Sequence, residues 1–155
     1  MLATTGFHYA MQATSSNEFC AQCHADNATK EWRESAHYRN SHGFVAGCAD
    51  CHLPEAFLPR VARKLRGATF EVWGQLAGVL DTPEKYEARR LEMAQTEWRR
   101  LRSDGAQECR GCHRTASMAE KSVADMHGAA LSGGATCTDC HQGVAHRAPA
   151  GSKQP

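Results

Sequence analysis

The five residues "CADCH" at positions 48–52 contain the pattern that decides this fold. The same spacing, Cys-x-x-Cys-His, recurs at residues 20–24, 109–113 and 137–141. The four copies use all eight cysteines of a chain of 155 residues. The function of the protein must therefore explain two cysteines three positions apart, with a histidine directly after the second.

Disulfides, zinc sites and covalent haem are the three chemistries that eight cysteines in a short chain allow. A disulfide framework does not require the histidine, and a closed zinc site with four ligands leaves it without a role. Covalent haem explains all three positions, because two thiols one helical turn apart bond the vinyl groups while the adjacent imidazole binds the iron. The sequence predicts four c-type haems attached through Cys20, Cys23, Cys48, Cys51, Cys109, Cys112, Cys137 and Cys140. The predicted motif ligands of the irons are His24, His52, His113 and His141.

The motifs are spaced as two equal pairs. The residue numbers of Cys20 and Cys48 differ by 28, as do those of Cys109 and Cys137, and each motif of the first pair precedes its counterpart by 89 residues. This regularity indicates an internal duplication of a two-haem unit.

The expected fold rests on this duplication. We predict a single, mainly α domain over residues 1–155, a small haem-packed multihaem cytochrome c fold. Its two duplicated dihaem units would be the pseudo-repeats 20–52 and 109–141, joined by a helical connector at 55–104. Folding and haem attachment should be inseparable, because iron ligation stabilises only the folded chain.

One further histidine stands at nearly the same place in each repeat. His37 comes 17 residues after Cys20, and His127 comes 18 residues after Cys109. A low-spin haem usually takes a second strong axial ligand. Because the repeat pairs these two histidines, a ligand role for one strengthens that role for the other.

The second and fourth motifs have different residues after them. His146 comes five residues after His141 and is a third candidate for a distal ligand. The corresponding residue after His52 is Phe57, which cannot bind iron. Three distal histidines for four haems leave one haem, which we expect to be the first, with a different sixth ligand.

Two helices are predicted in the connector, at residues 55–80 and 83–102. In the second, Thr82 can cap the helix and Pro83 suits its first turn. The first has a basic amphipathic pattern, which fits either a helix on a membrane surface or one packed on haem edges with snorkelling cations. Its cations are Arg60, Arg63, Lys64 and Arg66.

The bulk charge and hydropathy restrict the partners. A net charge of +1 argues against nucleic acid as a partner. No run of 18 apolar residues is present, so no complete membrane span is predicted. The opening "MLATTGFHYAMQA" lacks the features of a signal peptide. Because Cys-x-x-Cys-His maturation is extracytoplasmic in bacteria, we expect a trimmed chain whose export or anchor segment was removed or replaced at Met1.

Five segments of the chain resemble the NapC/NirT family, and the likeness runs from about Gly6 to Pro149. These are "FCAQCH", "AHYRN", "EVWG", "ECRGCH" and "CTDCHQGVAH". The family consists of tetrahaem quinol dehydrogenases, usually anchored by one N-terminal helix. The resemblance implies a periplasmic protein attached to the inner membrane, which oxidises menaquinol or ubiquinol and passes electrons to a periplasmic terminal reductase or cytochrome.

The resemblance also implies a set of distal ligands. It gives His37 to the fourth haem and His146 to the third. Lys64 stands where NrfH-type relatives use a lysine on the second haem. Because those relatives lack an equivalent of His127, we expect His127 on the second haem and Lys64 in the quinol pocket.

Quinol oxidation requires a haem edge and groups that accept two protons. Glu71 occupies the place of a family acidic residue beside the first haem, and Asp26 replaces a methionine that often comes after the first motif. The candidate quinol pocket therefore consists of Lys64, Glu71 and Asp26, with the other three haems forming a wire. Two alternatives stay open: a soluble electron shuttle between redox proteins, and a small reductase of nitrogen oxides.

Overall fold

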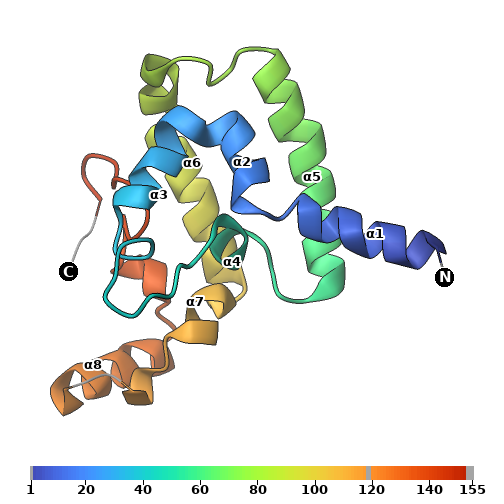
Figure 1. Ribbon diagram of the computed structural model, residues 1–155. Helices are drawn as coiled ribbons and strands as arrows, with labels where there is room; N and C mark the ends of the chain where they lie inside the picture. Colours follow the sequence, from blue (N-terminus) through green and yellow to red (C-terminus); the bar gives the residue numbers. More distant parts are fainter. Residues whose placement is uncertain (1, 118–119, 153–155) are drawn as a thin grey trace. The chain divides into compact units, whose positions relative to one another are not determined.

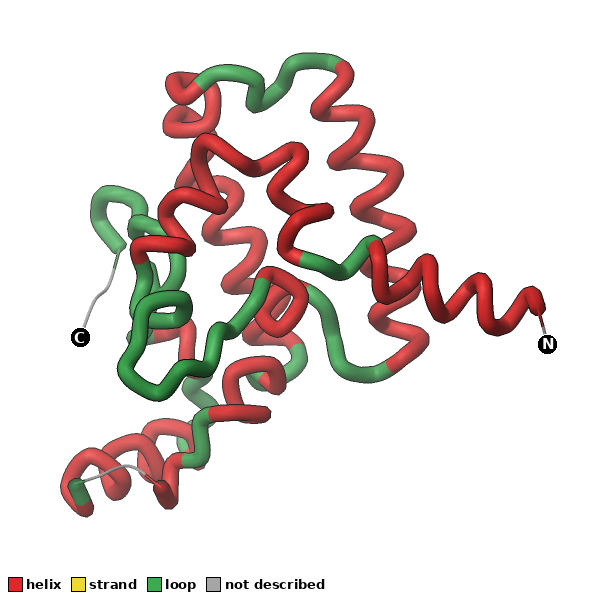
Figure 2. The backbone as a smooth tube through the Cα atoms, in the orientation of Figure 1, coloured by secondary structure: helices red, strands yellow, loops and turns green. Residues whose placement is uncertain are grey.

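The computed structural model describes residues 2–117 and 120–152, leaving aside the side chains of residues 2, 3, 25, 26 and 116. These described ranges form helices and loops without a strand, as Figures 1 and 2 show. The α-helices are α1 (Leu2–Ala13), α2 (Asn17–His24), α3 (Lys30–Glu34), α4 (Cys48–His52), α5 (Phe57–Leu76), α6 (Pro83–Ser103), α7 (Gln107–Cys112) and α8 (Lys121–Ser132). A π-helical turn spans Ala25–Thr29, and short 3-10 helices span Thr115–Ser117 and Cys137–Asp139. The predicted mainly α class is confirmed.

The chain divides into two compact units. The first unit runs to Ala88 and includes Val144–Arg147. The second unit contains Arg89–Gly143 and the segment from Ala148 onward. Each unit thus holds one pair of Cys-x-x-Cys-His motifs.

The two connector helices are present as α5 and α6. The N–H of Lys85 donates to Thr82 Oγ1 at 3.4 Å, so Thr82 caps the start of α6. Helix α5 ends at Leu76, a few residues before the predicted position. Gly78 adopts a φ of 64° directly after it, a left-handed conformation that glycine reaches without a steric penalty.

Few apolar side chains are buried in the described ranges. They are Trp32, Tyr86 and Ala106. The indole Nε1–H of Trp32 donates to the carbonyl of Ala46 at 2.8 Å, and its ring packs edge-on against Tyr38 with centroids 4.7 Å apart. A core this small cannot offset the entropy of ordering a chain of this length. Haem faces are therefore the apolar surface expected to complete it.

No helix within residues 2–117 and 120–152 is both long enough and apolar enough to cross a bilayer.

Candidate haem centres

Each Cys-x-x-Cys-His motif lies on a short helical turn. The first motif ends α2, the second forms α4, the third lies on α7, and the fourth begins with a 3-10 turn. In the last two motifs the histidine N–H donates to the carbonyl of the first cysteine at 2.8 Å, from His113 to Cys109 and from His141 to Cys137. The turn brings the two thiols to one side of the backbone, as attachment to one haem requires.

The second and fourth motifs are held by the same contact. The carboxylate of Asp50 accepts the N–H of Gly47 at 2.7 Å, and that of Asp139 accepts the N–H of Thr136 at 2.6 Å. These pairs stand 89 residues apart, like the motifs themselves. This contact was not predicted from the sequence, although an aspartate before the second cysteine in both "CADCH" and "CTDCH" signals it.

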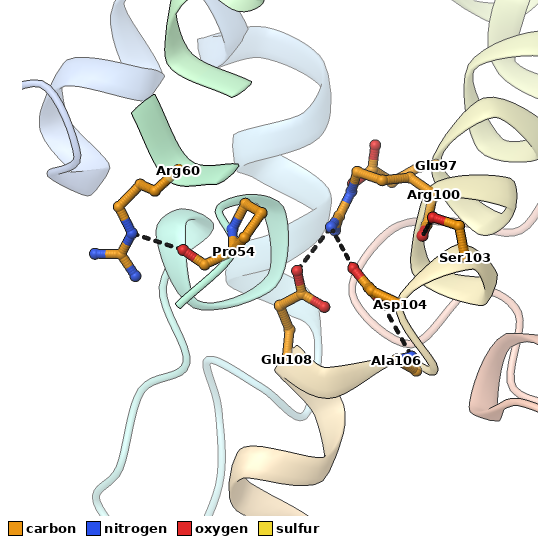
Figure 3. Close-up of polar contacts among 8 residues, drawn as sticks. All are labelled: Pro54, Arg60, Glu97, Arg100, Ser103, Asp104, Ala106 and Glu108. Carbon is orange, nitrogen blue, oxygen red and sulfur yellow. Dashed lines mark hydrogen bonds and ion pairs between the residues drawn. The ribbon is translucent and has the colours of Figure 1, made fainter. Parts of the chain in front are cut away.

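The third motif is fixed to α6 by a buried ion pair, shown in Figure 3. Arg100 Nη1 lies 2.7 Å from Glu108 Oε1, and the side chain of Glu108 is only 2% exposed. Arg100 also contacts Glu97 and Asp104. Burial alone would lower the pKa of Arg100, but the hydrogen bonds to Glu108 and Glu97 raise it overall. Because Glu108 precedes Cys109, this cluster fixes the start of the third motif. It was not predicted from the sequence.

The attachment cysteines of the first two motifs are neighbours within the first unit. A hydrogen bond between the thiols of Cys20 and Cys48 lowers the pKa of Cys20 to about 7 and raises that of Cys48. The N–H of Cys48 also donates to Asn17 Oδ1 at 2.8 Å, which ties α4 to α2. The lowered pKa favours the thiolate, the nucleophilic form of cysteine, at Cys20 before haem attachment.

Two of the predicted distal ligands have the ring orientation of metal-binding histidines. Nδ1 of His127 lies 2.8 Å from the carbonyl of Val123, and Nδ1 of His37 lies 3.0 Å from the carbonyl of Val144. A metal-binding histidine usually donates its second N–H to such a carbonyl, which leaves Nε2 for the metal. Both side chains therefore fit an axial role toward a haem.

Two pairs of histidine rings have a spacing that suits one iron. The ring centroids of His52 and His146 are 6.1 Å apart, and those of His127 and His141 are 5.8 Å apart. Metal–nitrogen bonds of about 2 Å, with ring centres roughly 1 Å further out, give about 6 Å between two axial imidazoles. His146 thus lies beside a different motif histidine from the one that the resemblance implies, and His127 lies beside a different one from the one we expected. Repeat spacing identifies a distal histidine but carries no information about which motif it faces.

The residue at the place of His146 in the first repeat packs with an aromatic ring. Phe57, at the start of α5, makes an edge-on contact with Phe7 of α1, with centroids 6.1 Å apart. His146 is a candidate iron ligand, whereas its repeat counterpart Phe57 links α1 to α5 in the first unit.

Lys64 is held by the C-terminal end of α1. Its Nζ donates to Met11 O at 3.1 Å, Thr14 Oγ1 at 2.5 Å and Ser15 Oγ at 2.8 Å. Burial lowers the pKa of Lys64. Three acceptors match the three donors of an ammonium group, which has no lone pair for iron. This geometry favours histidine over Lys64 as the ligand of the second haem.

The structure brings two of the three candidate pocket residues near the first motif. Lys64 and Glu71 both act electrostatically on Cys20, where the positive charge of Lys64 lowers the thiol pKa and Glu71 opposes it. The two side chains are seven positions apart on α5, so they lie on one side of that helix. The side chain of Asp26 falls outside the described residues.

The described cysteines are all free of disulfides. Within residues 2–117 and 120–152, no three histidine, cysteine or acidic side chains are grouped so that they could hold a bare metal ion.

Comparison with known proteins identifies one family. The model of the NapC/NirT cytochrome c family, N-terminal region, matches residues 1–151. The cytochrome c-type protein NapC of Escherichia coli strain K12 is 47% identical over 150 residues, which cover 93% of this chain and 74% of NapC. The denitrification system component NirT of Stutzerimonas stutzeri is 40% identical, with 94% and 75% covered. A putative tetrahaem cytochrome of Allochromatium vinosum is also 40% identical, with 91% and 79% covered. No solved structure matches.

Proposed function

Because the chain belongs to the NapC/NirT family of c-type cytochromes, which carry electrons in respiration, we propose that it is a tetrahaem quinol dehydrogenase of the periplasm. It takes electrons from menaquinol or ubiquinol and passes them to a periplasmic reductase. In this proposal the protein works attached to the inner membrane.

Four covalent haems supply the electron-carrying groups in this proposal, one at each motif. The motif histidines bind the irons on one side. The distal ligands are His37, His127 and His146. The ring spacings favour His146 opposite His52 and His127 opposite His141, and the first haem has a different sixth ligand.

The quinol pocket in this proposal lies beside the first haem. The single observation that carries it is the placement of Lys64 and Glu71 on one side of α5, close enough to Cys20 to change its pKa. A carboxylate oxygen of Glu71 accepts a proton from the bound quinol, and the ammonium of Lys64 stabilises the negative charge that develops on the quinol oxygen. Asp26 is the third proposed member.

The test is reduction of the purified haem protein by water-soluble menaquinol and ubiquinol analogues in stopped-flow absorbance. Glu71→Gln should slow reduction about a hundredfold, the lower end for a lost general base. Glu92→Gln is the matched control, since Glu92 is an exposed residue of α6 paired with Arg89. Failure of the native protein to be reduced, also when it is attached to a membrane, would contradict the proposal and favour a shuttle between proteins.

A further inference from the structure

Helix α5 exposes a continuous apolar stripe. At 3.6 residues per turn, Leu58, Leu65, Val72 and Leu76 lie within about 40° of one another around the helix. The exposed fractions of the three leucines are 74%, 64% and 75%, and that of the neighbouring Trp73 is 72%. Large apolar surface of this kind on a folded domain marks an interaction site.

The charged residues of α5, apart from Arg66, lie on the other side of the helix. Lys64 contacts the end of α1, and Arg60 donates to the carbonyl of Pro54. Viewed along the helix axis, the exposed arc runs from Val72 through the leucines and Trp73 to Phe70. Arg66 is the one charged residue of α5 in this arc, and its guanidinium lies 5.6 Å from the centre of the Phe70 ring. This distribution is the reverse of a water-facing helix, which turns its charges outward.

Lys64 and Glu71 act electrostatically on Cys20, and both lie about 80° or more around α5 from the leucines and Val72. A haem bonded to Cys20 would therefore meet α5 on the Lys64 side, and the stripe would be left for another apolar partner.

We propose that the stripe of α5 lies in the interface of an anionic phospholipid bilayer. Arg66 lies within the exposed arc and Arg63 lies beside Phe70 at the end of that arc, so these two of the four cations of α5 are placed for headgroups. The helix as a whole carries a single carboxylate, that of Glu71. A helix with an apolar face, an interfacial tryptophan and a surplus of positive charge binds in the plane of anionic headgroups. Arg66 reaches those headgroups from the edge of the stripe. The inference does not depend on quinol oxidation, because lipid binding needs no quinol.

The test is flotation of the haem-loaded protein with vesicles of phosphatidylcholine, with and without phosphatidylglycerol. We expect binding to the anionic vesicles that weakens as salt is raised. The double variant Leu65→Gln, Val72→Gln should lose about tenfold in affinity, since both side chains are exposed and their replacement leaves the fold intact. Arg66→Glu should also weaken binding. Leu91→Gln, at a half-exposed leucine of α6, is the matched control.

Four results would overturn the proposal. One is no flotation with anionic vesicles, and another is an equal loss of binding in the Leu91→Gln control. The third is concentration-dependent dimerisation without vesicle binding, abolished by the Leu65 and Val72 substitutions, which would make a second copy of the chain the partner. Equal binding to neutral vesicles would contradict the role given to charge.

Discussion

The imidazole rings of His127 and His141 lie nearly parallel, with an interplanar angle of 14° and centroids 5.8 Å apart. His127 is held in this orientation by the carbonyl of Val123, one turn earlier on α8. The arrangement leads us to expect that both rings bind the iron of the fourth haem. His146 and His52 would bind that of the second.

Replacing His127 by Met should therefore change the ligand field of one haem, the fourth. His146→Met should change the second haem alone. The measurement is the near-infrared magnetic circular dichroism of each variant, combined with NMR assignment of the shifted haem methyl groups. His42→Met, at an exposed histidine of the loop before the second motif, is the control. A change at the second haem in His127→Met, or at the third in His146→Met, would instead support the pairing expected from the sequence.

The ion pair of Glu108 and Arg100 should contribute strongly to stability. Glu108→Ala leaves the half-buried guanidinium of Arg100 without its most buried partner, and we expect a loss of about 3 kcal/mol in the free energy of unfolding. Glu97 and Asp104 remain near Arg100, which keeps the loss at the low end for a buried pair. Urea unfolding monitored by far-ultraviolet circular dichroism measures the change.

Glu92→Ala is the control for this experiment. Its ion pair with Arg89 is exposed on α6, so its loss should cost less than about 1 kcal/mol. Equal losses in the two variants would show that the Glu108 pair has no special weight in fixing the third motif.

Lys64→Met should loosen the end of α1. The variant keeps most of the side-chain volume but removes the donors to Met11, Thr14 and Ser15. Amide hydrogen exchange in residues 10–16 should accelerate, with little change in α6. Lys85→Met is the matched control, because Nζ of Lys85 makes similar contacts with Gly78 O and Asp81. Unchanged exchange in α1 would rule out this anchoring role.

The helical class and the connector helices were predicted from the sequence and are confirmed, because the cap at Thr82 and the proline at position 83 are local signals. The haem attachment residues stay a prediction from the Cys-x-x-Cys-His pattern. The sequence did not predict the burial of Glu108 or the contacts of Lys64. Both depend on which helices meet in space, and nothing in the spacing of charges along the chain reveals that. The amphipathic pattern of α5 was visible in the sequence. The structure was needed to show which face of α5 is exposed, through the contacts of Lys64 and the exposure of Leu65.

The neighbours of the distal histidines show the same limit. The repeat paired His37 with His127 by position, and both have a ring nitrogen directed at a backbone carbonyl. The ring beside each distal histidine depends on the path of the loops that carry the motifs. Periodicity therefore identifies the candidate ligands, and tertiary structure decides their partners.

The most direct test of the account is a count of haem ligand fields in the oxidised, haem-loaded protein. Mass spectrometry should first show four covalent haems on the chain. Magnetic circular dichroism and electron paramagnetic resonance should then show three low-spin haems with two histidine ligands and one haem, the first, with a different signal. Four equivalent bis-histidine haems would contradict the account, because His8 or His42 would then have to be a ligand.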